Sequence, residues 1–345
     1  MSLPHAEPAV LHPPRWDDPR AEQLRKAPLR TRWWYALKPA SWPKLLVPAV
    51  LGQGAGALHA GRVSAQGLVV GAGFSVLLLV FIVLLNDWSD AEVDRVKRAM
   101  YPQGCRPKTI PDGLLSSGAL LTGGLLALGL GLGLAFAGAH ASHTPLLGWS
   151  ALACAGIFMA YSLPPLRLNY RGGGELLEAL GVGFALPAWN ALAQGGEALP
   201  AVLVDLLPAF VALSLASALA SGLSDENSDR AGGKRTFTTQ FGNASVRRGI
   251  EACVLLAAVL FVVGPRVMRA IAAGDSAGPL APALVGGLVG AAAALAAWVR
   301  MRAVTPEPVT DAFVAQALFK ERLHGAIWYG SLAVLLTRAL MTETA

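Results

Sequence analysis

Stretches of apolar residues long enough to cross a lipid bilayer dominate this chain. A spanning helix needs about 20 predominantly apolar residues, and 54% of the 345 residues are hydrophobic whereas only 14% are charged. Helices are the expected spanning form, because backbone polar groups in lipid must form hydrogen bonds within their own segment. The sequence therefore predicts an all-α membrane protein with a bundle of nine transmembrane helices. These helices are expected at residues 45–60, 67–85, 114–139, 145–163, 176–193, 201–223, 252–273, 279–299 and 323–340.

The distribution of basic residues predicts the orientation of this bundle. Residues 1–44 carry eight Lys and Arg, and alternate connections between the predicted helices carry sixteen, whereas the intervening connections carry three. Cytoplasmic loops of membrane proteins are enriched in Lys and Arg. We therefore expect a multi-pass protein of the cell inner (cytoplasmic) membrane, with its N-terminus in the cytoplasm and its C-terminus outside. This topology also accounts for the formal net charge of +6, so no nucleic-acid partner is expected.

The chain divides into a polar tail, residues 1–44, and one helical domain, residues 45–345. The tail has no short apolar region followed by a cleavage site, as a secretory signal would. We expect it to be partly disordered or interfacial, because Trp33, Trp34 and Tyr35 belong to the residue types that prefer the headgroup zone. The three cysteines are scattered and predict no disulfide framework.

Two acidic clusters follow long apolar segments, where a carboxylate is costly unless it is paired, hydrated or bound to a cation. The first cluster spans residues 86–94 and the second spans residues 224–230. If each cluster continues the preceding helix, residues four apart share a face, and each cluster presents a stripe of oxygen ligands. These ligands are Asn86, Asp87, Asp90 and Asp94 in the first cluster, and Asp225 and Asp229 in the second.

Oxygen ligands of this kind suit a hard divalent cation. Mg²⁺ is usually bound by one or two carboxylates together with substrate phosphates. A loop containing several Lys and Arg residues follows each cluster, and such side chains bind phosphate. The alternative interpretation is that both clusters are ordinary charged helix ends, balanced by their neighbours. Both clusters have acidic residues four apart, and a loop with several Lys and Arg residues follows each of them. This repetition favours a site that binds metal and diphosphate.

These motifs resemble those of the UbiA superfamily of intramembrane prenyltransferases. The first cluster resembles the first signature of the family, and residues 225–236 resemble the second. Residues 161–175 are similar to the corresponding loop of the branch that prenylates 1,4-dihydroxy-2-naphthoate in menaquinone biosynthesis. That branch usually has a glycine before the last aspartate of the first cluster, whereas this chain has Val93 there. 4-Hydroxybenzoate or another aromatic acceptor therefore stays open.

The resemblance implies a central cavity, capped by cytoplasmic acidic loops, in which a polyprenyl group passes from an allylic polyprenyl diphosphate to an aromatic acceptor. It implies two Mg²⁺ ions that bridge the diphosphate. The expected metal ligands are Asp87, Asp90, Asp94, Asp225 and Asp229, with Asn86 in the same catalytic set. The expected diphosphate contacts are Lys38, Arg106, Tyr161, Arg167, Arg171 and Lys234.

Two other functions use similar features. A secondary transporter places its ionisable residues near the bilayer midplane, whereas these clusters lie at helix ends. A membrane terpene cyclase of the same superfamily shares the diphosphate site, and the apolar acceptor pocket has no signature that excludes it. Elsewhere, we expect Asp205 to be solvated near the outer surface and Asn190 to hydrogen-bond between helices. The oligomeric state and the length of the isoprenoid stay open.

Overall fold

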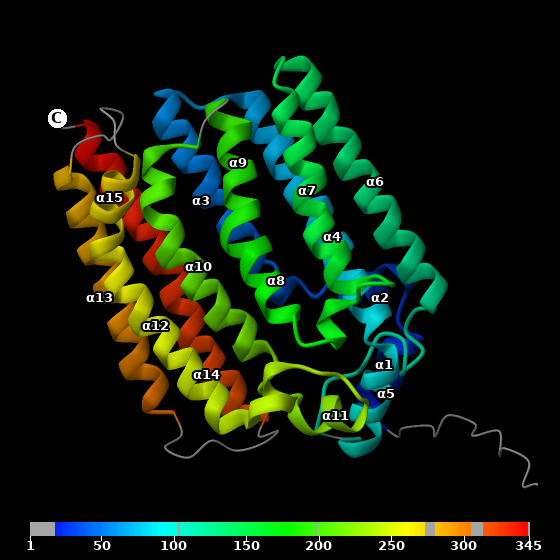
Figure 1. Cartoon of the computed structure of the whole chain (residues 1–345). Helices are drawn as coiled ribbons and strands as arrows, with labels where there is room; N and C mark the ends of the chain where they lie inside the picture. Colours follow the sequence, from blue (N-terminus) through cyan, green and yellow to red (C-terminus); the bar gives the residue numbers. More distant parts are fainter. Residues whose placement is uncertain (1–17, 103, 197–198, 273–279, 305–312, 344–345) are drawn as a thin grey trace, which may run out of the picture.

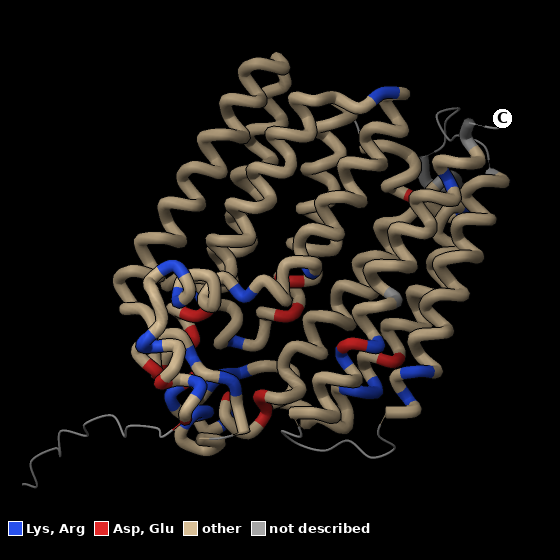
Figure 2. Tube along the Cα trace, turned by 180° about the vertical axis from the view of Figure 1, so that it is seen from behind, with Lys and Arg blue, Asp and Glu red and all other residues tan. Residues whose placement is uncertain are grey.

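The part of the chain described by the computed structural model consists of helices and their connections. It covers residues 18–102, 104–196, 199–272, 280–304 and 313–343. The long helices stand side by side in a bundle, and most charged residues gather at one end of it (Figures 1 and 2). In chain order the elements are α1 (Pro19–Lys26), α2 (Leu29–Ala36), η1 (Pro39–Ser41), α3 (Pro43–Ala60), α4 (Ala65–Ser89), α5 (Ala91–Met100), α6 (Ser117–Ala141), α7 (Pro145–Ser162), η2 (Leu168–Tyr170), α8 (Gly174–Leu180), η3 (Gly181–Ala185), α9 (Leu186–Gly195), α10 (Ala201–Ser221), α11 (Glu226–Ala231), α12 (Phe237–Ala272), α13 (Leu280–Arg302), α14 (Phe313–Gly325), η4 (Ala326–Gly330) and α15 (Ser331–Glu343).

Seven helices of the described residues are long and apolar enough to cross a membrane, so the protein is an integral, multi-pass membrane protein. They are α4, α6, α7, the run from α8 to α9, α10, α12 and α13, which match the second to eighth of the predicted spans. The first and ninth predicted spans are helical too, as α3 and as the run from α14 to α15. Both runs lie alongside the seven and reach the same two ends of the bundle (Figure 1). They are not among the seven candidates, and the count of nine stays a prediction.

Close backbone approach holds the long helices together. A Cβ atom added to Gly52 of α3 would lie 2.1 Å from the carbonyl oxygen of Pro187 in α9. A Cβ atom added to Gly287 of α13 would lie 2.2 Å from the carbonyl oxygen of Phe261 in α12. Since no side chain fits at such distances, glycine at these positions lets membrane helices pack tightly.

Two polar residues inside the bundle test the expectations for Asn190 and Asp205. Asn190 accepts a hydrogen bond of 2.8 Å from Gln53 and donates one of 3.0 Å to Ser75, which confirms its interhelical role. The expectation for Asp205 was wrong: its side chain is buried and lies 3.0 Å from Nη1 of Arg338. Because the final helix places an arginine beside it, this carboxylate is neutralised inside the protein instead of by water.

Residues 18–44 of the predicted tail are folded against the charged end of the bundle. Asp18 accepts a hydrogen bond of 2.9 Å from the backbone of Arg20 at the start of α1, and lies 2.7 Å from the buried guanidinium of Arg98. The Tyr35 hydroxyl in α2 donates a 2.8 Å hydrogen bond to the carbonyl oxygen of Pro107. Residues 1–17 lie outside the described part of the chain, and the domain boundary stays a prediction.

Candidate active site

The first acidic cluster lies where α4 passes into α5. Asp90 sits at the junction, and the helical hydrogen bonds continue through it. Its backbone N–H donates to the carbonyl oxygen of Asn86 at 2.9 Å, and its own carbonyl oxygen accepts from Asp94 at 2.8 Å. Because this register is helical, the expected spacing of four residues is present. Asn86, Asp90 and Asp94 therefore follow one face of the helical path, and Asp87 is the most buried carboxylate of the cluster, with 4% exposure.

The second acidic cluster forms the short helix α11, which follows α10. Asp225 precedes the first residue of α11, and its carbonyl oxygen accepts a 2.8 Å hydrogen bond from the backbone N–H of Asp229. The next turn ends at Gly232 and Gly233, and Gly233 has a φ of 72°, which favours glycine. This left-handed turn leads the chain into Lys234, whose backbone N–H donates to the carbonyl oxygen of Asp229 at 2.8 Å.

Lysines join the two clusters in a reciprocal way. Lys234, which follows the second cluster, lies 2.9 Å from the Asp90 carboxylate of the first. Lys97, which follows the first cluster, forms an ion pair with the Asp225 carboxylate of the second. The structure thus brings together two segments that are far apart in the sequence, at the charged end of the bundle (Figure 2).

The remaining carboxylates of the first cluster are also paired. Lys38, which follows α2, forms an ion pair with Asp87. The Thr109 hydroxyl donates a 2.6 Å hydrogen bond to the other oxygen of Asp87. Lys108 lies 2.5 Å from the carboxylate of Asp94. Four lysines from four segments therefore point at the two clusters.

The pKa values at these clusters show that the carboxylates affect one another. Burial raises the pKa of Asp229, the charges of Asp225 and Asp90 add to this rise, and Lys234 opposes it, so that the pKa is about 7. Burial also raises the pKa of Asp225, but Lys97 and Lys108 outweigh it, so that this pKa lies below its ordinary value. Asp90 belongs to the first cluster, so the two clusters lie within electrostatic range of each other.

Three of the other predicted contacts lie near this centre. Lys38 pairs with Asp87, as described above. Tyr161 lies in the last turn of α7 and is close enough to Lys234 to help raise the pKa of that lysine. Arg167 donates hydrogen bonds to Ser89, between Asp87 and Asp90, and its guanidinium lies 3.7 Å from the centre of the Tyr170 ring.

The structure does not bring the side chains of Arg106 and Arg171 to the carboxylates. Both residues are exposed, and neither side chain forms a hydrogen bond or ion pair within the described part of the chain. The backbone of Arg171 pairs instead with Arg235, next to Lys234. Their predicted role as diphosphate contacts is not tested by the contacts present and stays a prediction.

Several lysines near the site were not singled out from the sequence, whereas the sequence leaves a functional role for Glu178 open. Lys97 and Lys108 lie in basic loops that contain many similar residues, so nothing in the sequence marked these two. A further polar group lies between α3, α8 and α10, where Lys44 forms an ion pair with Glu178 and donates a 2.9 Å hydrogen bond to Ser221. Lys44 stands at the start of an apolar helix, and this position is the sequence feature that could have predicted the polar group.

The oxygen atoms of the two clusters are of the kind that binds a hard cation. Among the described residues, no three His, Cys, Asp or Glu side chains are grouped closely enough to hold a metal ion. The Oδ1 atom of Asn86 is buried and has no hydrogen-bond partner, so it is an oxygen ligand with spare capacity. Amide and carboxylate oxygens are the ligands of Mg²⁺. The set of metal ligands and the number of ions stay predictions, as does the central cavity.

Comparison with known proteins settles the family. The model of the UbiA prenyltransferase family matches residues 45–320, which is most of the chain. The chain belongs to the UbiA prenyltransferase family. The protein is therefore a member of a family of transferase enzymes, and the resemblance inferred from its two acidic clusters is confirmed.

One curated relative of this UbiA-family protein is the Arabidopsis thaliana protein named 2-carboxy-1,4-naphthoquinone phytyltransferase, chloroplastic. The two are 29% identical over 167 residues, and the match covers 47% of this chain and 40% of that protein. The chain thus matches less than half of the length of this relative.

Solved structures share the fold of this UbiA-family protein. A UbiA homolog from Archaeoglobus fulgidus, bound to GPP and Mg²⁺, has a TM-score of 0.61 and 18% identity, over 88% of this chain and 99% of that one. A digeranylgeranylglyceryl phosphate synthase has a TM-score of 0.59 and 13% identity, over 90% of this chain and 99% of that one. At these identities the likeness establishes the fold.

Proposed function

We propose that this protein transfers a polyprenyl group from an allylic diphosphate to an aromatic acceptor in quinone biosynthesis, and that the acceptor is 1,4-dihydroxy-2-naphthoate. The convergence of two carboxylate clusters, with lysines between them, is the observation that carries the proposal. A diphosphate needs cations on several sides, and four lysines from separate segments supply them here. The relative of this family that binds GPP and Mg²⁺ has the same fold.

The carboxylates hold the metal, and the lysines hold the diphosphate. Two Mg²⁺ ions, when bound by Asp87, Asp90, Asp94, Asp225 and Asp229, would supply Lewis-acid neutralisation of the departing diphosphate. Asn86 would add its unpartnered oxygen to this set. Lys38, Lys108 and Lys234 act as point charges that orient the diphosphate. Tyr161 and Arg167 lie near the same lysines and carboxylates and would add contacts to the diphosphate.

Apolar side chains next to the first cluster exclude water from the reacting carbon. Phe81 and Leu85 of α4 precede Asp87 by six and two residues, and both are fully buried. An allylic cation formed when the C–O bond breaks reacts with water unless water is kept out. The ring of the acceptor then attacks the allylic carbon as the diphosphate leaves. With 1,4-dihydroxy-2-naphthoate the ring carboxylate is lost as CO₂, whereas with 4-hydroxybenzoate a ring proton is lost and the carboxylate stays.

The polar group formed by Lys44, Glu178 and Ser221 provides a place for the acceptor carboxylate. It lies between helices of the bundle, and Lys44 brings a cation there. Both 1,4-dihydroxy-2-naphthoate and 4-hydroxybenzoate carry a carboxylate, so this lysine suits either acceptor. The partial similarity to a naphthoquinone phytyltransferase favours the first, and 4-hydroxybenzoate is the second candidate.

We also propose that the charged end of the bundle faces the cytoplasm, with nine spans and an external C-terminus. In support of this, α3 and the run from α14 to α15 reach both ends of the bundle, and α15 lies at the end opposite α5 and α11 (Figure 1).

The deciding experiment is a product assay on vesicles that contain the purified protein, Mg²⁺ and an allylic polyprenyl diphosphate. Parallel reactions contain 1,4-dihydroxy-2-naphthoate or 4-hydroxybenzoate, and mass spectrometry identifies the product. We expect a decarboxylated prenyl-naphthoquinol. A prenylated 4-hydroxybenzoate would move the protein to the second candidate, a cyclised product without acceptor would indicate a terpene cyclase, and no release of diphosphate from any donor would refute the prenyltransferase proposal.

A further inference from the structure

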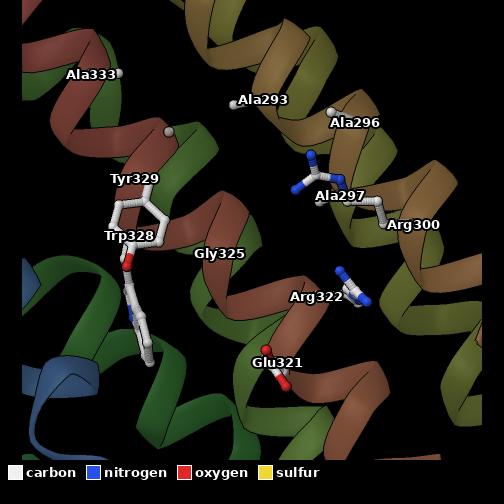
Figure 3. A pocket seen from close by; sticks show the side chains of 11 residues that line it. Ala293, Ala296, Ala297, Arg300, Glu321, Arg322, Gly325, Trp328, Tyr329 and Ala333 are labelled. Carbon is white, nitrogen blue, oxygen red and sulfur yellow. The ribbon is translucent and has the colours of Figure 1, made fainter.

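A groove of about 540 Å³ lies between α13 and the run from α14 to α15 (Figure 3). None of its lining residues belongs to the acidic clusters or to the polar group around Lys44. Its volume is within the range of pockets that bind small molecules. One wall is made of small apolar side chains of α13, namely Ala293, Ala296 and Ala297.

The shape of the groove follows from small residues on both sides. A Cβ atom added to Gly330 would lie 2.8 Å from the Cβ of Ala293, so the two helical runs are in close contact there. Gly325 lines the groove toward the charged end, where nothing lies within 4 Å of an added Cβ atom. The groove is therefore narrow near Gly330 and open near Gly325.

Two arginines lie at the open end of this groove. Arg300 is in the last turn of α13 and Arg322 is in the last turn of α14. Figure 3 shows both side chains in the space between the two helices. Both residues are exposed, and within the described residues neither guanidinium forms a hydrogen bond or an ion pair. Glu321 is the single acidic residue among those that line the groove, so the positive charge exceeds the negative.

The neighbouring arginine of the same helix turn differs. Arg302 lies 3.7 Å from the carboxylate of Glu251 and 5.1 Å from the centre of the Trp298 ring. Its charge is thus already balanced by a carboxylate of α12. Arg300 and Arg302 therefore form a natural pair of test and control positions on one helix.

We propose that this groove binds an anionic phospholipid, with its phosphate between Arg300 and Arg322 and one acyl chain along the alanines of α13. The charges are complementary, and basic pockets between transmembrane helices bind anionic headgroups. α13 is a candidate span that ends at Arg302, so Arg300 lies where the helix leaves the hydrocarbon.

The test compares lipid retention by the full-length protein in detergent micelles, measured by native mass spectrometry. Phosphatidylglycerol and phosphatidylcholine with identical acyl chains compete for the protein, and a third arm adds inorganic phosphate. We expect the protein to retain phosphatidylglycerol preferentially. Arg300→Gln and Arg322→Gln should each lower this preference about fivefold, which corresponds to ~1 kcal/mol per basic residue. Inorganic phosphate should not displace the lipid.

Arg302→Gln is the matched control and should leave the preference unchanged, because this arginine is paired with Glu251. Ala296→Phe adds bulk to the apolar wall without a change of charge, and should lower phosphatidylglycerol retention at least about fivefold. Equal retention of both lipids by the unmodified protein, or displacement by inorganic phosphate, would overturn the proposal. If the arginine variants do not fold, unchanged retention in Ala296→Phe overturns it.

Discussion

In the first acidic cluster every aspartate forms an ion pair with a lysine. In the second cluster Asp225 forms such a pair, whereas Asp229 forms none within the described residues. The consequence is visible in the charge states. Asp225 has a pKa below its ordinary value, because its lysines outweigh burial. Burial and the neighbouring carboxylates Asp225 and Asp90 raise the pKa of Asp229 to about 7. Ionised Asp229 thus needs a cation that the described residues do not place on it.

The reciprocal lysines show why neither cluster works alone. Lys97 follows the first cluster and pairs with the second, and Lys234 follows the second and pairs with the first. A substrate that draws both lysines to its phosphates would leave carboxylates of both clusters to a metal. The comparison therefore predicts that both clusters are equally necessary, although among the described residues only the second contains an aspartate that forms no ion pair with a lysine.

The largest effect is expected when a carboxylate of either cluster becomes an amide. Asp90→Asn and Asp229→Asn should each lower kcat by about 10²- to 10³-fold, because each removes a charge that supports transition-state stabilisation. The rate of diphosphate release, with Mg²⁺ and donor at saturation, measures this loss. Near-normal turnover in either variant would refute the assignment of both clusters to the metal site.

Glu92→Gln is the matched control for this pair. Glu92 belongs to the first cluster by sequence, but it is exposed and pairs with Arg95 instead of a site lysine. Its turnover should stay within about threefold of the unmodified protein, because an exposed ion pair contributes little.

The second prediction tests the reciprocal pairing. Lys234→Gln and Lys97→Gln should each raise the KM for the diphosphate about 10- to 100-fold, since a hydrogen bond to a charged group is worth about 1.5–3 kcal/mol. Steady-state kinetics with varied donor and saturating acceptor measures it. Arg95→Gln, which removes a basic residue two positions before Lys97, is the control. A large effect of one lysine and none of the other would contradict the reciprocal arrangement.

The sequence predicts the acidic clusters well because their signal is local. The spacing of Asn86, Asp90 and Asp94 requires only that the helix continue, and the backbone hydrogen bonds do continue through Asp90. Seven of the predicted spans coincide with candidate spanning helices for the same reason, since each depends on one uninterrupted apolar segment.

What the sequence cannot predict is which distant residue meets which. From the sequence we expect Asp205 to be solvated, but the final helix places Arg338 beside it in the folded protein. Lys97 and Lys108 look like their basic neighbours, and only the folded chain directs them to Asp225 and Asp94. Both cases depend on contacts between segments far apart in the chain, where no periodicity carries information.

The third prediction concerns the acceptor, which should respond to a residue outside both clusters. Lys44→Met removes the cation of the polar group that includes Glu178 and Ser221. We expect the KM for the aromatic acceptor to rise about tenfold, which corresponds to ~1.4 kcal/mol, while the KM for the diphosphate stays unchanged. Product formation with each substrate varied in turn measures both. A rise in the KM for the diphosphate alone would assign Lys44 to the donor instead.

The fourth prediction uses the unequal charge states of the clusters. The pKa of Asp229 is about 7 in the folded protein, against 3.8 for an ordinary aspartate, so the folded protein binds more protons than the unfolded chain between these pH values. Its contribution to stability therefore falls as pH rises from about 4 to about 7 and is constant above that. Asp90 and Asp225 raise this pKa, whereas Lys97 and Lys234 oppose it.

Thermal unfolding in detergent with EDTA measures this dependence. The melting temperature of the unmodified protein should fall by about 6 °C over this pH range. A pKa difference of about 3 corresponds to ~4 kcal/mol, and the unfolding entropy is about 2.1 cal/mol/K per residue. Asp229→Asn should flatten this part of the profile, and Glu92→Gln should leave it as it is. An equal slope in Asp229→Asn and in the unmodified protein would show that this carboxyl does not titrate there.

The smallest effects are expected at Arg106 and Arg171, where the sequence pattern and the geometry disagree. The sequence pattern assigns both to the diphosphate, but both side chains are exposed and form no hydrogen bond or ion pair within the described residues. If their arrangement persists with substrate bound, Arg106→Gln and Arg171→Gln change the KM for the diphosphate by less than about threefold, as for exposed charges in general. A rise of tenfold or more in either variant would mean that its loop closes on the substrate. The diphosphate would then be held by arginines that move, in addition to the lysines already in place on the carboxylates.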